Sequence, residues 1–288
     1  GPPTSGGMTV IQILKLLEDK GLDKLKPTSP EAVHLFAQAG KLAYADRGKY
    51  MADADFVDAP VEGLIDGDYL AERAKLITDK DMGKATAGTP PNADKSWLQS
   101  KSPEQPSTTH FSIVDKEGNG FSMTSSIEMA FGSTVMVRGF LLNNQLTDFS
   151  FSEEKNGELV ANRVQPGKRP RSSMSPFMVF DKDDNLTMVI GSPGGSRIIN
   201  YVAKTMLGVM EWNMDIQAAI SMPHFVNRNG ATDLEKDTDI AGIKKDLEAL
   251  GHKVNVRDLN SGLHGITINA EGMQGGADPR RVGRALGK

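Results

Sequence analysis

Cysteine is absent from the 288 residues of this chain. Its absence excludes disulfide bonds, thiolate nucleophiles and cysteine-based zinc sites, and it leaves the redox compartment open. A long apolar run is also missing, because the best candidate, residues 130–142, is interrupted by Gly132, Arg138 and Gly139. A bilayer-spanning helix needs about 20 apolar residues. The sequence therefore predicts no membrane segment.

Neither sign of charge is in clear excess, since 33 Lys and Arg stand against 37 Asp and Glu. The basic residues do not cluster, which argues against a nucleic-acid-binding protein, whose binding face is rich in Lys and Arg. The histidines form no HExxH or H-x3-H pair, so we expect no metal site and no cofactor. They are His34, His110, His224, His252 and His264.

The chain does not begin with methionine, and Met8 is the first one. Position 1 is therefore not expected to be a natural translation start, and the lack of a signal peptide says nothing about localisation. Two interpretations are open from these residues alone. The first residues are either an addition made for expression, or the beginning of a piece cut from a longer protein.

Apolar spacing predicts helices in the first third of the chain. One helix is expected over residues 9–20, and a second starts at Ser29-Pro30, with serine as its N-cap, and continues through residues 43–47. A third helix is expected over residues 68–76. Glycine and proline then accumulate between residues 80 and 107, so this segment is predicted to be exposed and mobile.

The period changes to two at Thr108, which indicates strands. Residues 108–114 and 121–127 flank a turn and predict a β-hairpin, as do residues 177–180 and 186–190. Further strands are expected over 253–256 and 265–269, and helices over 197–212, from Asp215, and over 243–250. Hairpins followed by segregated helices indicate an α+β layered protein rather than a doubly wound one.

Three polar segments are candidates for chemistry, although each has an ordinary structural explanation. Residues 191–196 (GSPGGS) precede a helix, where exposed N–H groups can hold an anion or oxyanion, but taken alone they are better explained by an ordinary tight turn. They do not form a G-x-S-x-G nucleophile elbow. Gln145 and Asp148 are placed to share one side of a turn, or are surface residues. Residues 172–176 (SSMSP) have the composition of a polar loop.

The order of these segments resembles the γ-glutamyltransferase (glutathione hydrolase) family over the whole chain. The long motifs are residues 108–115 (TTHFSIVD), 140–150 (FLLNNQLTDFS), 166–176 (PGKRPRSSMSP) and 191–197 (GSPGGSR). Shorter matches are residues 2–7 (PPTSGG), 44–47 (YADR) and 277–281 (ADPRR).

The resemblance implies an α+β fold of the N-terminal-nucleophile hydrolase type, an αββα four-layer sandwich made from a precursor that cuts itself in two. The cut would fall between Ser107 and Thr108. Residues 1–107 would be the C-terminal segment of the large subunit, ending in the linker before the cleavage site. Residues 108–288 would be the small, catalytic subunit. The fold is then incomplete, because the N-terminal part of the large subunit is missing, and the continuous sequence corresponds to an uncleaved form.

The implied chemistry agrees with the properties of threonine. A threonine hydroxyl is a poor nucleophile until a base takes its proton, and a terminal threonine carries its own base, the α-amine. An α-amine titrates at about 7.7–8.0, so part of it is neutral at physiological pH. Before cleavage that nitrogen is an amide, and the precursor is expected to be inactive.

The resemblance also implies residue roles. Thr108 would be the nucleophile that carries the γ-glutamyl group as an ester, and Gly194 and Gly195 would supply the N–H groups of the oxyanion hole. Ser126 stands where the most familiar members of the family have threonine, and it would assist the nucleophile. No cofactor and no metal are implied.

The implied substrate-binding residues are Ser172 and Ser173 for the substrate α-carboxylate, and Gln145 and Asp148 for its α-ammonium. Glu128 stands where familiar members have asparagine, which contacts the ammonium. A glutamate there adds a second carboxylate to the one that Asp148 contributes, or it forms a salt bridge elsewhere, for instance with Arg138. An arginine that pairs with the carboxylate in the family belongs to the missing part.

The expected function is self-processing γ-glutamyl hydrolysis or transfer, from glutathione-like peptides to water or to an amino-acid or peptide acceptor. Two alternatives are a related acylase for glutaryl or other γ-acyl amides, and a non-catalytic remnant on the same scaffold. The expected partner is the missing N-terminal part of the large subunit. Because bacterial members are commonly exported, the expected location is the periplasm or the exterior.

Overall fold

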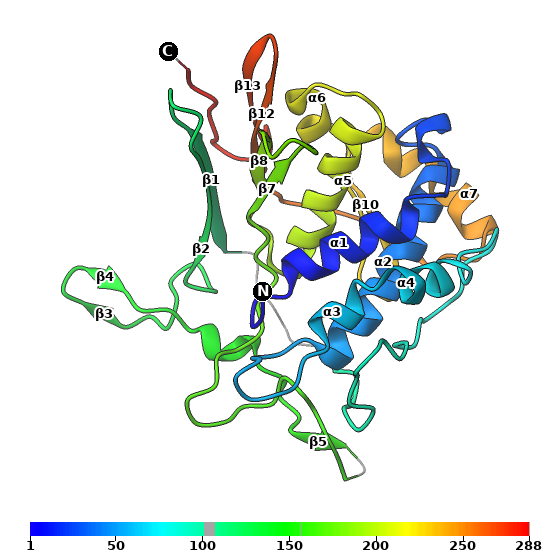
Figure 1. Cartoon of the computed structure of the whole chain (residues 1–288), viewed down its shortest axis with the longest axis vertical. Helices are drawn as coiled ribbons and strands as arrows, with labels where there is room; N and C mark the ends of the chain where they lie inside the picture. Colours follow the sequence, from blue (N-terminus) through cyan, green and yellow to red (C-terminus); the bar gives the residue numbers. More distant parts are fainter. Residues whose placement is uncertain (101–106, 156, 288) are drawn as a thin grey trace. The chain divides into compact units, whose positions relative to one another are not determined.

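The computed structural model describes residues 1–100, 107–155 and 157–287 (Figure 1). They divide into two compact units. The first unit contains Gly1–Glu104, Leu146–Ser172 and Pro223–Leu259, and the second contains Gln105–Gln145, Ser173–Met222 and Asn260–Lys288. The units therefore interleave along the sequence. The predicted subunit boundary between 107 and 108 concerns a covalent cut, and it stays a prediction.

The first unit is built around one long helix, α2 (Pro30–Tyr50). Ser29 caps it by accepting a hydrogen bond from the Ala32 N–H at 3.2 Å, and proline occupies its first turn, as the sequence predicts. Nearly all of its side chains are buried. The other helices of this unit are α1 (Gly6–Leu17), α3 (Val61–Leu64), α4 (Gly67–Ala74) and α7 (Lys244–Ala249), with 3-10 turns η1 (Leu22–Lys24) and η4 (Asp239–Ile243).

A three-stranded sheet packs against α2. Its order is β11 (Val254–Arg257), β10 (Thr232–Glu235) and β9 (Phe225–Asn227), with β10 parallel to β11 and antiparallel to β9. The ring of Phe36 on α2 meets the ring of Phe225 edge to face, with 5.1 Å between centroids. This contact places the core of the unit between helix and sheet. A separate small hairpin, β5 (Glu154–Lys155) with β6 (Glu158–Leu159), also belongs to this unit.

Residues 80–100, part of the segment predicted to be exposed and mobile, form no helix and no strand beyond an isolated bridge between Leu98 and Val160. They are nevertheless tied to the first unit. Asp81 forms an ion pair with Lys41 of α2, the Ala85 N–H donates to Asn229 Oδ1 at 2.8 Å, and the Ser100 N–H donates to a carbonyl of α2 at 2.9 Å. The rest of the predicted mobile segment, residues 101–106, lies outside the described residues.

The second unit contains two sets of antiparallel strands. The hairpin of β1 (Thr108–Val114) and β2 (Gly120–Ser126) is the first, and a four-stranded sheet is the second. The order of that sheet is β13 (Gly272–Ala277), β12 (His264–Asn269), β8 (Leu186–Gly191) and β7 (Phe177–Phe180). The remaining elements are α5 (Ile198–Met210), α6 (Ile216–Ser221), β3 (Met136–Val137), β4 (Phe140–Leu141) and η3 (Gly195–Arg197). The 3-10 turn η2 (Gln145–Asp148) lies at the boundary, with Gln145 in the second unit and residues 146–148 in the first.

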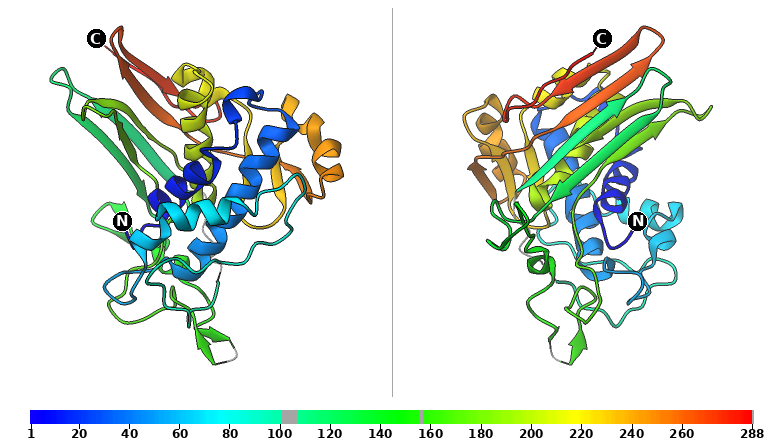
Figure 2. Two further views of the ribbon diagram at one scale, coloured as in Figure 1. Left: turned by 45° about the vertical axis from the view of Figure 1, so that its right-hand side comes forward. Right: turned by 90° about the vertical axis from the view of Figure 1, so that its left-hand side faces the viewer.

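These elements form three layers in the second unit: helices, sheet and hairpin (Figure 2). The hairpin packs on β8 and β12, where a Cβ atom at Gly191 would lie 2.3 Å from the His110 ring. Helices α5 and α6 cover the other face, where Ile216 lies close to Gly265 of β12. Alternation along β1 buries Thr108 and His110, so the nucleophile candidate stands on the inner face. No helix among the described residues has the length and apolar character that a bilayer requires.

Candidate functional site

Thr108 and Ser126 face each other at the end of the β1–β2 ladder. The Thr108 Oγ1 hydroxyl donates to Ser126 Oγ at 3.2 Å. Ser126 Oγ also accepts from the Glu128 N–H at 2.9 Å, and it donates to the carbonyl oxygen of Ser107 at 3.5 Å. A serine hydroxyl has one proton and two lone pairs, so these three bonds use its full capacity. A chain of hydrogen bonds thus runs from the Thr108 hydroxyl to the carbonyl of the preceding residue.

The backbone of Thr108 is held by the C-terminal tail of the second unit. Arg281 Nη1 donates to the Thr108 carbonyl oxygen at 3.3 Å, while its Nε donates to Asn260 Oδ1 at 3.1 Å. The neighbouring Arg280 faces elsewhere and donates to the carbonyls of Ile220 and Met222 at the end of α6. The two arginines of the 277–281 motif therefore fasten the tail to different elements.

A cavity of about 380 Å³ opens beside Thr108 within the second unit. His110 and His264 line it, together with Pro193, Gly262 and tail residues 281–284. Burial, with a smaller contribution from His264, lowers the pKa of His110 to about 3. His110 is therefore neutral at physiological pH. It contributes no positive charge next to Thr108.

Gly194 and Gly195 form the turn that leads into α5. Both have positive φ, 140° and 58°, and a Cβ atom at Gly194 would lie 2.7 Å from the Tyr201 ring. Glycine is therefore required at this turn for reasons of backbone geometry. The turn passes directly into η3 and then α5, and the first N–H groups of a helix have no acceptor within the helix. The N–H groups of such a turn can hold an anionic oxygen.

Glu128 is buried two residues after Ser126, with a left-handed backbone at φ 71°. Arg138, the alternative partner expected from the sequence, is exposed. Ser173 is also buried, and its carbonyl accepts from Ser175 Oγ at 2.9 Å.

Gln145 and Asp148 are the first and last residues of η2. Side chains three apart in a 3-10 turn eclipse each other, so the two share one side, as the sequence predicts. Asp148 is buried, and its carbonyl accepts from Asn162 Nδ2 at 2.8 Å.

Ser172, the last residue of its segment of the first unit, is held by the 2–7 motif. Its hydroxyl is hydrogen-bonded to Thr4 Oγ1, and its carbonyl accepts from the N–H of Ser5 at 2.9 Å and from Ser5 Oγ at 2.7 Å. These hydrogen bonds were not predicted from the sequence, because Thr4 and Ser5 lie 168 and 167 positions before Ser172.

The basic side chains of the 166–176 motif anchor its loop. Arg169 pairs with Asp53, and Arg171 donates to the carbonyls of Arg47 and Met51 at the end of α2. Lys168 Nζ donates to the Ala161 carbonyl at 2.6 Å, and burial lowers the pKa of Lys168 to about 8. The positive charges of this motif are thus engaged by the protein itself, and its serines are the better candidates for a ligand.

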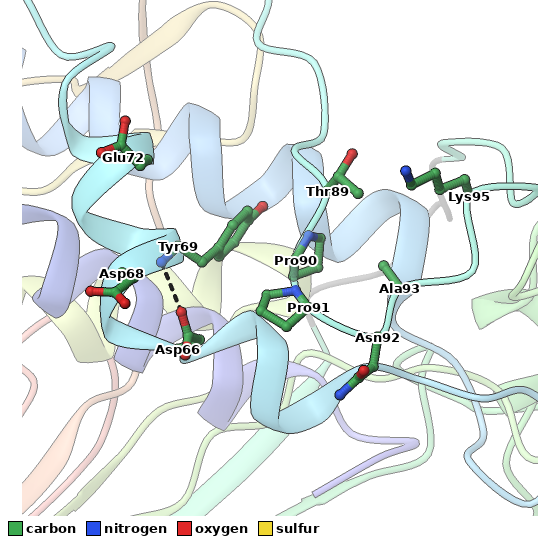
Figure 3. Close-up of a pocket in the computed structure, with 10 residues that line it drawn as sticks. All are labelled: Asp66, Asp68, Tyr69, Glu72, Thr89, Pro90, Pro91, Asn92, Ala93 and Lys95. Carbon is green, nitrogen blue, oxygen red and sulfur yellow. Dashed lines mark hydrogen bonds between the residues drawn. The ribbon is translucent and has the colours of Figure 1, made fainter.

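A second cavity, of about 760 Å³, lies between α4 and residues 89–95 of the first unit (Figure 3). Its acidic side chains are Asp66, Asp68 and Glu72, and Asp66 caps α4 by accepting from the Tyr69 N–H at 2.8 Å. None of the predicted site residues lines this cavity. Within the described ranges, no group of three or more His, Asp or Glu side chains is placed to hold a metal ion.

Known proteins were compared with this chain. The family model for gamma-glutamyltranspeptidase matches residues 1–288. The chain is 37% identical to the glutathione hydrolase proenzyme of Bacillus subtilis (strain 168), over 99% of this chain and 50% of that protein. It is 34% identical to the acylase ACY 1 proenzyme of Pseudomonas sp. (strain SE83), over 96% of this chain and 47% of that protein. The chain thus spans about half the length of these relatives.

The solved structure of cephalosporin acylase from Bacillus halodurans superposes with a TM-score of 0.82, over 99% of this chain and 49% of that one, at 24% identity. This likeness concerns the fold, and with the helices and sheets described above it confirms the predicted α+β fold class. Because the family model matches every residue, the chain belongs to the gamma-glutamyltranspeptidase family.

Proposed function

We propose that this chain carries the catalytic part of a self-processing γ-glutamyl hydrolase or transferase. The observation that carries the proposal is the hydrogen-bond chain from Thr108 Oγ1 through Ser126 Oγ to the Ser107 carbonyl oxygen. It links the Thr108 hydroxyl, which would attack, to the peptide bond between Ser107 and Thr108, which would break. In this proposal residues 1–107 end the large subunit and residues 108–288 form the small one.

Self-cleavage would begin with attack of Thr108 Oγ1 on the carbonyl carbon of Ser107. Ser126 Oγ takes the hydroxyl proton while its own proton passes to the carbonyl oxygen of Ser107, so Ser126 stays neutral. The C–N bond to Thr108 then breaks as the proton on that oxygen moves through Ser126 to the nitrogen, which leaves as an amine. Water hydrolyses the resulting ester, which releases the Ser107 carboxylate and restores the Thr108 hydroxyl.

Turnover would use the same hydroxyl with the new α-amine as its base. Thr108 Oγ1 attacks the γ-carbonyl of the donor, the leaving amine takes the proton, and a γ-glutamyl ester forms. The N–H groups of Gly194 and Gly195 stabilise the oxyanion. Water or an amino acceptor then attacks the ester and releases the γ-glutamyl group.

The proposed substrate is a γ-glutamyl peptide such as glutathione, in line with the name of the Bacillus subtilis relative. Its α-carboxylate would be bound by Ser172 and Ser173. Its α-ammonium would be bound by Gln145, Asp148 and Glu128. The complete enzyme would also include a polypeptide equivalent to the half of the relatives that this chain does not span, and we propose a periplasmic or secreted location.

The test is intact-mass spectrometry of the complete precursor, as its gene encodes it, together with hydrolysis of γ-glutamyl-p-nitroanilide. The wild type should give a chain that begins at Thr108, and Thr108→Ala should give one uncut chain without activity. Thr109→Ala is the matched control and should be cut normally. Cleavage of Thr108→Ala at the 107/108 bond would refute the assignment and make Thr109 the candidate nucleophile.

A related acylase activity is the second candidate, because a relative of nearly the same identity is named an acylase. An acylase for glutaryl amides has no need to bind an α-ammonium. Glutaryl-p-nitroanilide lacks that group and therefore separates the two activities. A higher kcat/KM for the glutaryl donor than for the γ-glutamyl donor would favour the acylase.

A further inference from the structure

The 2–7 motif and Ser172 are joined by three hydrogen bonds within the first unit. Thr4 and Ser172 form an isolated parallel β-bridge, and their hydroxyls are hydrogen-bonded to each other. Ser5, the next residue, donates to the Ser172 carbonyl with both its N–H and its hydroxyl. A motif at the start of the chain thus fixes both the backbone and the hydroxyl of a candidate ligand-binding residue.

The direction of the Ser5 hydroxyl is determined by Arg47 of α2. Arg47 Nε lies 2.7 Å from Ser5 Oγ, and a guanidinium N–H can only donate. Ser5 Oγ therefore accepts from Arg47, and its single proton goes to the Ser172 carbonyl. Ser5 is fully buried and Arg47 is 5% exposed, so this relay is shielded from water.

The residue before Ser172 is held equally firmly. The Arg171 N–H donates to Asn162 Oδ1 at 3.0 Å, and its side chain donates to the carbonyls of Arg47 and Met51. The carbonyl of Ser172 is already occupied by Ser5. The hydroxyl is thus the polar group of Ser172 that can still change its direction, and its contact is Thr4.

We propose that Thr4 is a positioning residue that turns the Ser172 hydroxyl proton toward the substrate carboxylate. The inference rests on the proposed role of Ser172 in binding the α-carboxylate. In the hydroxyl pair either oxygen can donate to the other. A carboxylate only accepts, so its arrival selects the arrangement in which Ser172 donates to the ligand and Thr4 donates to Ser172.

This arrangement strengthens Ser172 as a donor. A hydroxyl that accepts one hydrogen bond donates a stronger one, because successive bonds in a chain polarise each other. Without the Thr4 hydroxyl, Ser172 loses that polarisation and its proton is free to rotate. The cost should therefore fall on binding of the α-carboxylate and not on the chemical step at Thr108.

The chain offers closely matched variants. Thr4→Val replaces the hydroxyl with a methyl group of nearly the same shape, and Thr4→Ser restores the hydroxyl. Thr9→Val is the control, because the Thr9 hydroxyl is fully buried and donates to the Ser5 carbonyl at 2.8 Å. It removes a buried hydrogen bond from the same segment without touching Ser172.

The experiment measures kcat and KM of the complete, self-cleaved enzyme with two donors. They are γ-glutamyl-p-nitroanilide and 4-aminobutanoyl-p-nitroanilide, which lacks only the α-carboxylate. Thr4→Val should raise KM for the first donor by about three- to tenfold, the usual effect of one hydrogen bond, with kcat within about twofold. KM for the second donor should stay unchanged, and Thr4→Ser should restore the wild-type value.

Ser172→Ala, alone and combined with Thr4→Val, separates the possible failures. If Thr4 acts through Ser172, the double variant should bind the γ-glutamyl donor no worse than Ser172→Ala. An equal rise in KM for both donors in Thr4→Val would overturn the inference and make Thr4 merely structural. A rise in KM for the γ-glutamyl donor alone in the control Thr9→Val would overturn it as well. If Ser172→Ala discriminates between donors and Thr4→Val does not, only the Thr4 role fails.

If Ser172→Ala does not discriminate either, the proposed role of Ser172 fails, and with it the inference. Thr4→Ala provides a second removal of the hydroxyl if the valine variant does not fold. Its expected pattern is the same: a selective rise in KM for the donor that has an α-carboxylate.

Discussion

Thr108 Oγ1 donates to Ser126 Oγ across the terminal pair of the β1–β2 ladder, with 3.2 Å between the oxygens. The pairing register produces this contact, because Thr108 lies directly opposite Ser126. Side chains alternate between the faces of a strand, so a slip of one residue would turn Ser126 away from Thr108. The hairpin turn at residues 115–119 therefore matters for the proposed chemistry, although it lies at the far end of both strands.

Removal of the Ser126 hydroxyl should slow both self-cleavage and turnover. Ser126→Ala interrupts the path from Thr108 to the Ser107 carbonyl, and we expect a loss of roughly a hundredfold, typical of a missing proton-transfer group. Ser126→Thr keeps the hydroxyl and should stay within about tenfold of wild type. Mass spectrometry of the precursor over time gives the cleavage rate. Ser125→Ala, on the outer face of β2, is the control, and a wild-type rate in Ser126→Ala would contradict the relay.

Replacement of both Ser172 and Ser173 by alanine should weaken recognition of the substrate carboxylate. Each hydrogen bond to a charged group contributes about 1.5–3 kcal/mol. The loss in kcat/KM should be large with a γ-glutamyl donor and small with the 4-aminobutanoyl donor. An equal loss on both donors would show that these serines maintain the loop rather than bind the ligand.

Exchange of Glu128 for asparagine should separate backbone geometry from charge. Glu128 has φ 71°, and asparagine adopts that region more readily than glutamate. The melting temperature of Glu128→Asn should therefore be equal to or higher than that of wild type. If the carboxylate contacts the α-ammonium, kcat/KM should fall about tenfold for the γ-glutamyl donor and little for the glutaryl donor.

Glu128→Gln is the matched comparison, because it removes the charge at constant side-chain length. Both variants should show the same donor selectivity, and only Glu128→Asn should gain stability. Unchanged kinetics on both donors would remove Glu128 from the site.

Acid should destabilise the first unit through Asp53. Its carboxylate is fully buried and accepts from the Arg169 N–H at 2.8 Å and from its guanidinium, and hydrogen bonds from that side chain lower the pKa of Asp53 to about 2. A carboxylate with a lowered folded-state pKa stabilises the protein above its unfolded-state pKa of about 3.9. That stabilisation is lost as the pH falls from about 4 toward 2.

Asp53→Asn should therefore lower the urea midpoint at neutral pH, by an amount corresponding to about 1–2 kcal/mol, and flatten its fall between about pH 5 and 2. The estimate is modest because the Arg169 side chain is 55% exposed. Asp55→Asn removes the other, exposed carboxylate that pairs with Arg169 and should change the midpoint little. A pH profile of Asp53→Asn parallel to that of wild type would contradict the assignment.

The local sequence pattern predicted many of the helices and strands, because turns, helix caps and alternating burial depend on residues that are close together in the sequence. Alternation around a turn placed both hairpins, β1–β2 and β7–β8, within about a residue, and Ser29-Pro30 placed the start of α2. The sequence did not indicate β13, whose residues GMQGGA carry no alternation, or β10, whose polar residues are buried. These strands form because neighbouring strands provide their hydrogen-bond partners, and a local pattern does not contain that information.

The candidate site likewise has a part that the sequence predicted and a part that it did not. The roles proposed for Thr108, Ser126 and the glycines at 194 and 195 come from the family resemblance, and the structure adds the hydrogen bond between Thr108 and Ser126. The support of Ser172 by Thr4 and Ser5 was not expected, because these residues lie 168 and 167 positions before it. The two arginines of the 166–176 motif are anchors: Arg171 is buried and donates to the carbonyls of Arg47 and Met51, and Arg169 pairs with Asp53.

The hydrogen bond from Arg281 to the Thr108 carbonyl oxygen affects what would happen after self-cleavage. A cut before Thr108 would turn it into a chain end, and free chain ends usually fray. Here the carbonyl is held by Arg281 and the hydroxyl by Ser126 while the chain is still intact. Two of the three polar groups of the future terminus are thus preassembled, and only the amine has to be released. Breaking one bond would then be enough to switch the enzyme on, with no rearrangement to follow, so activity should increase in step with the appearance of the cut chain.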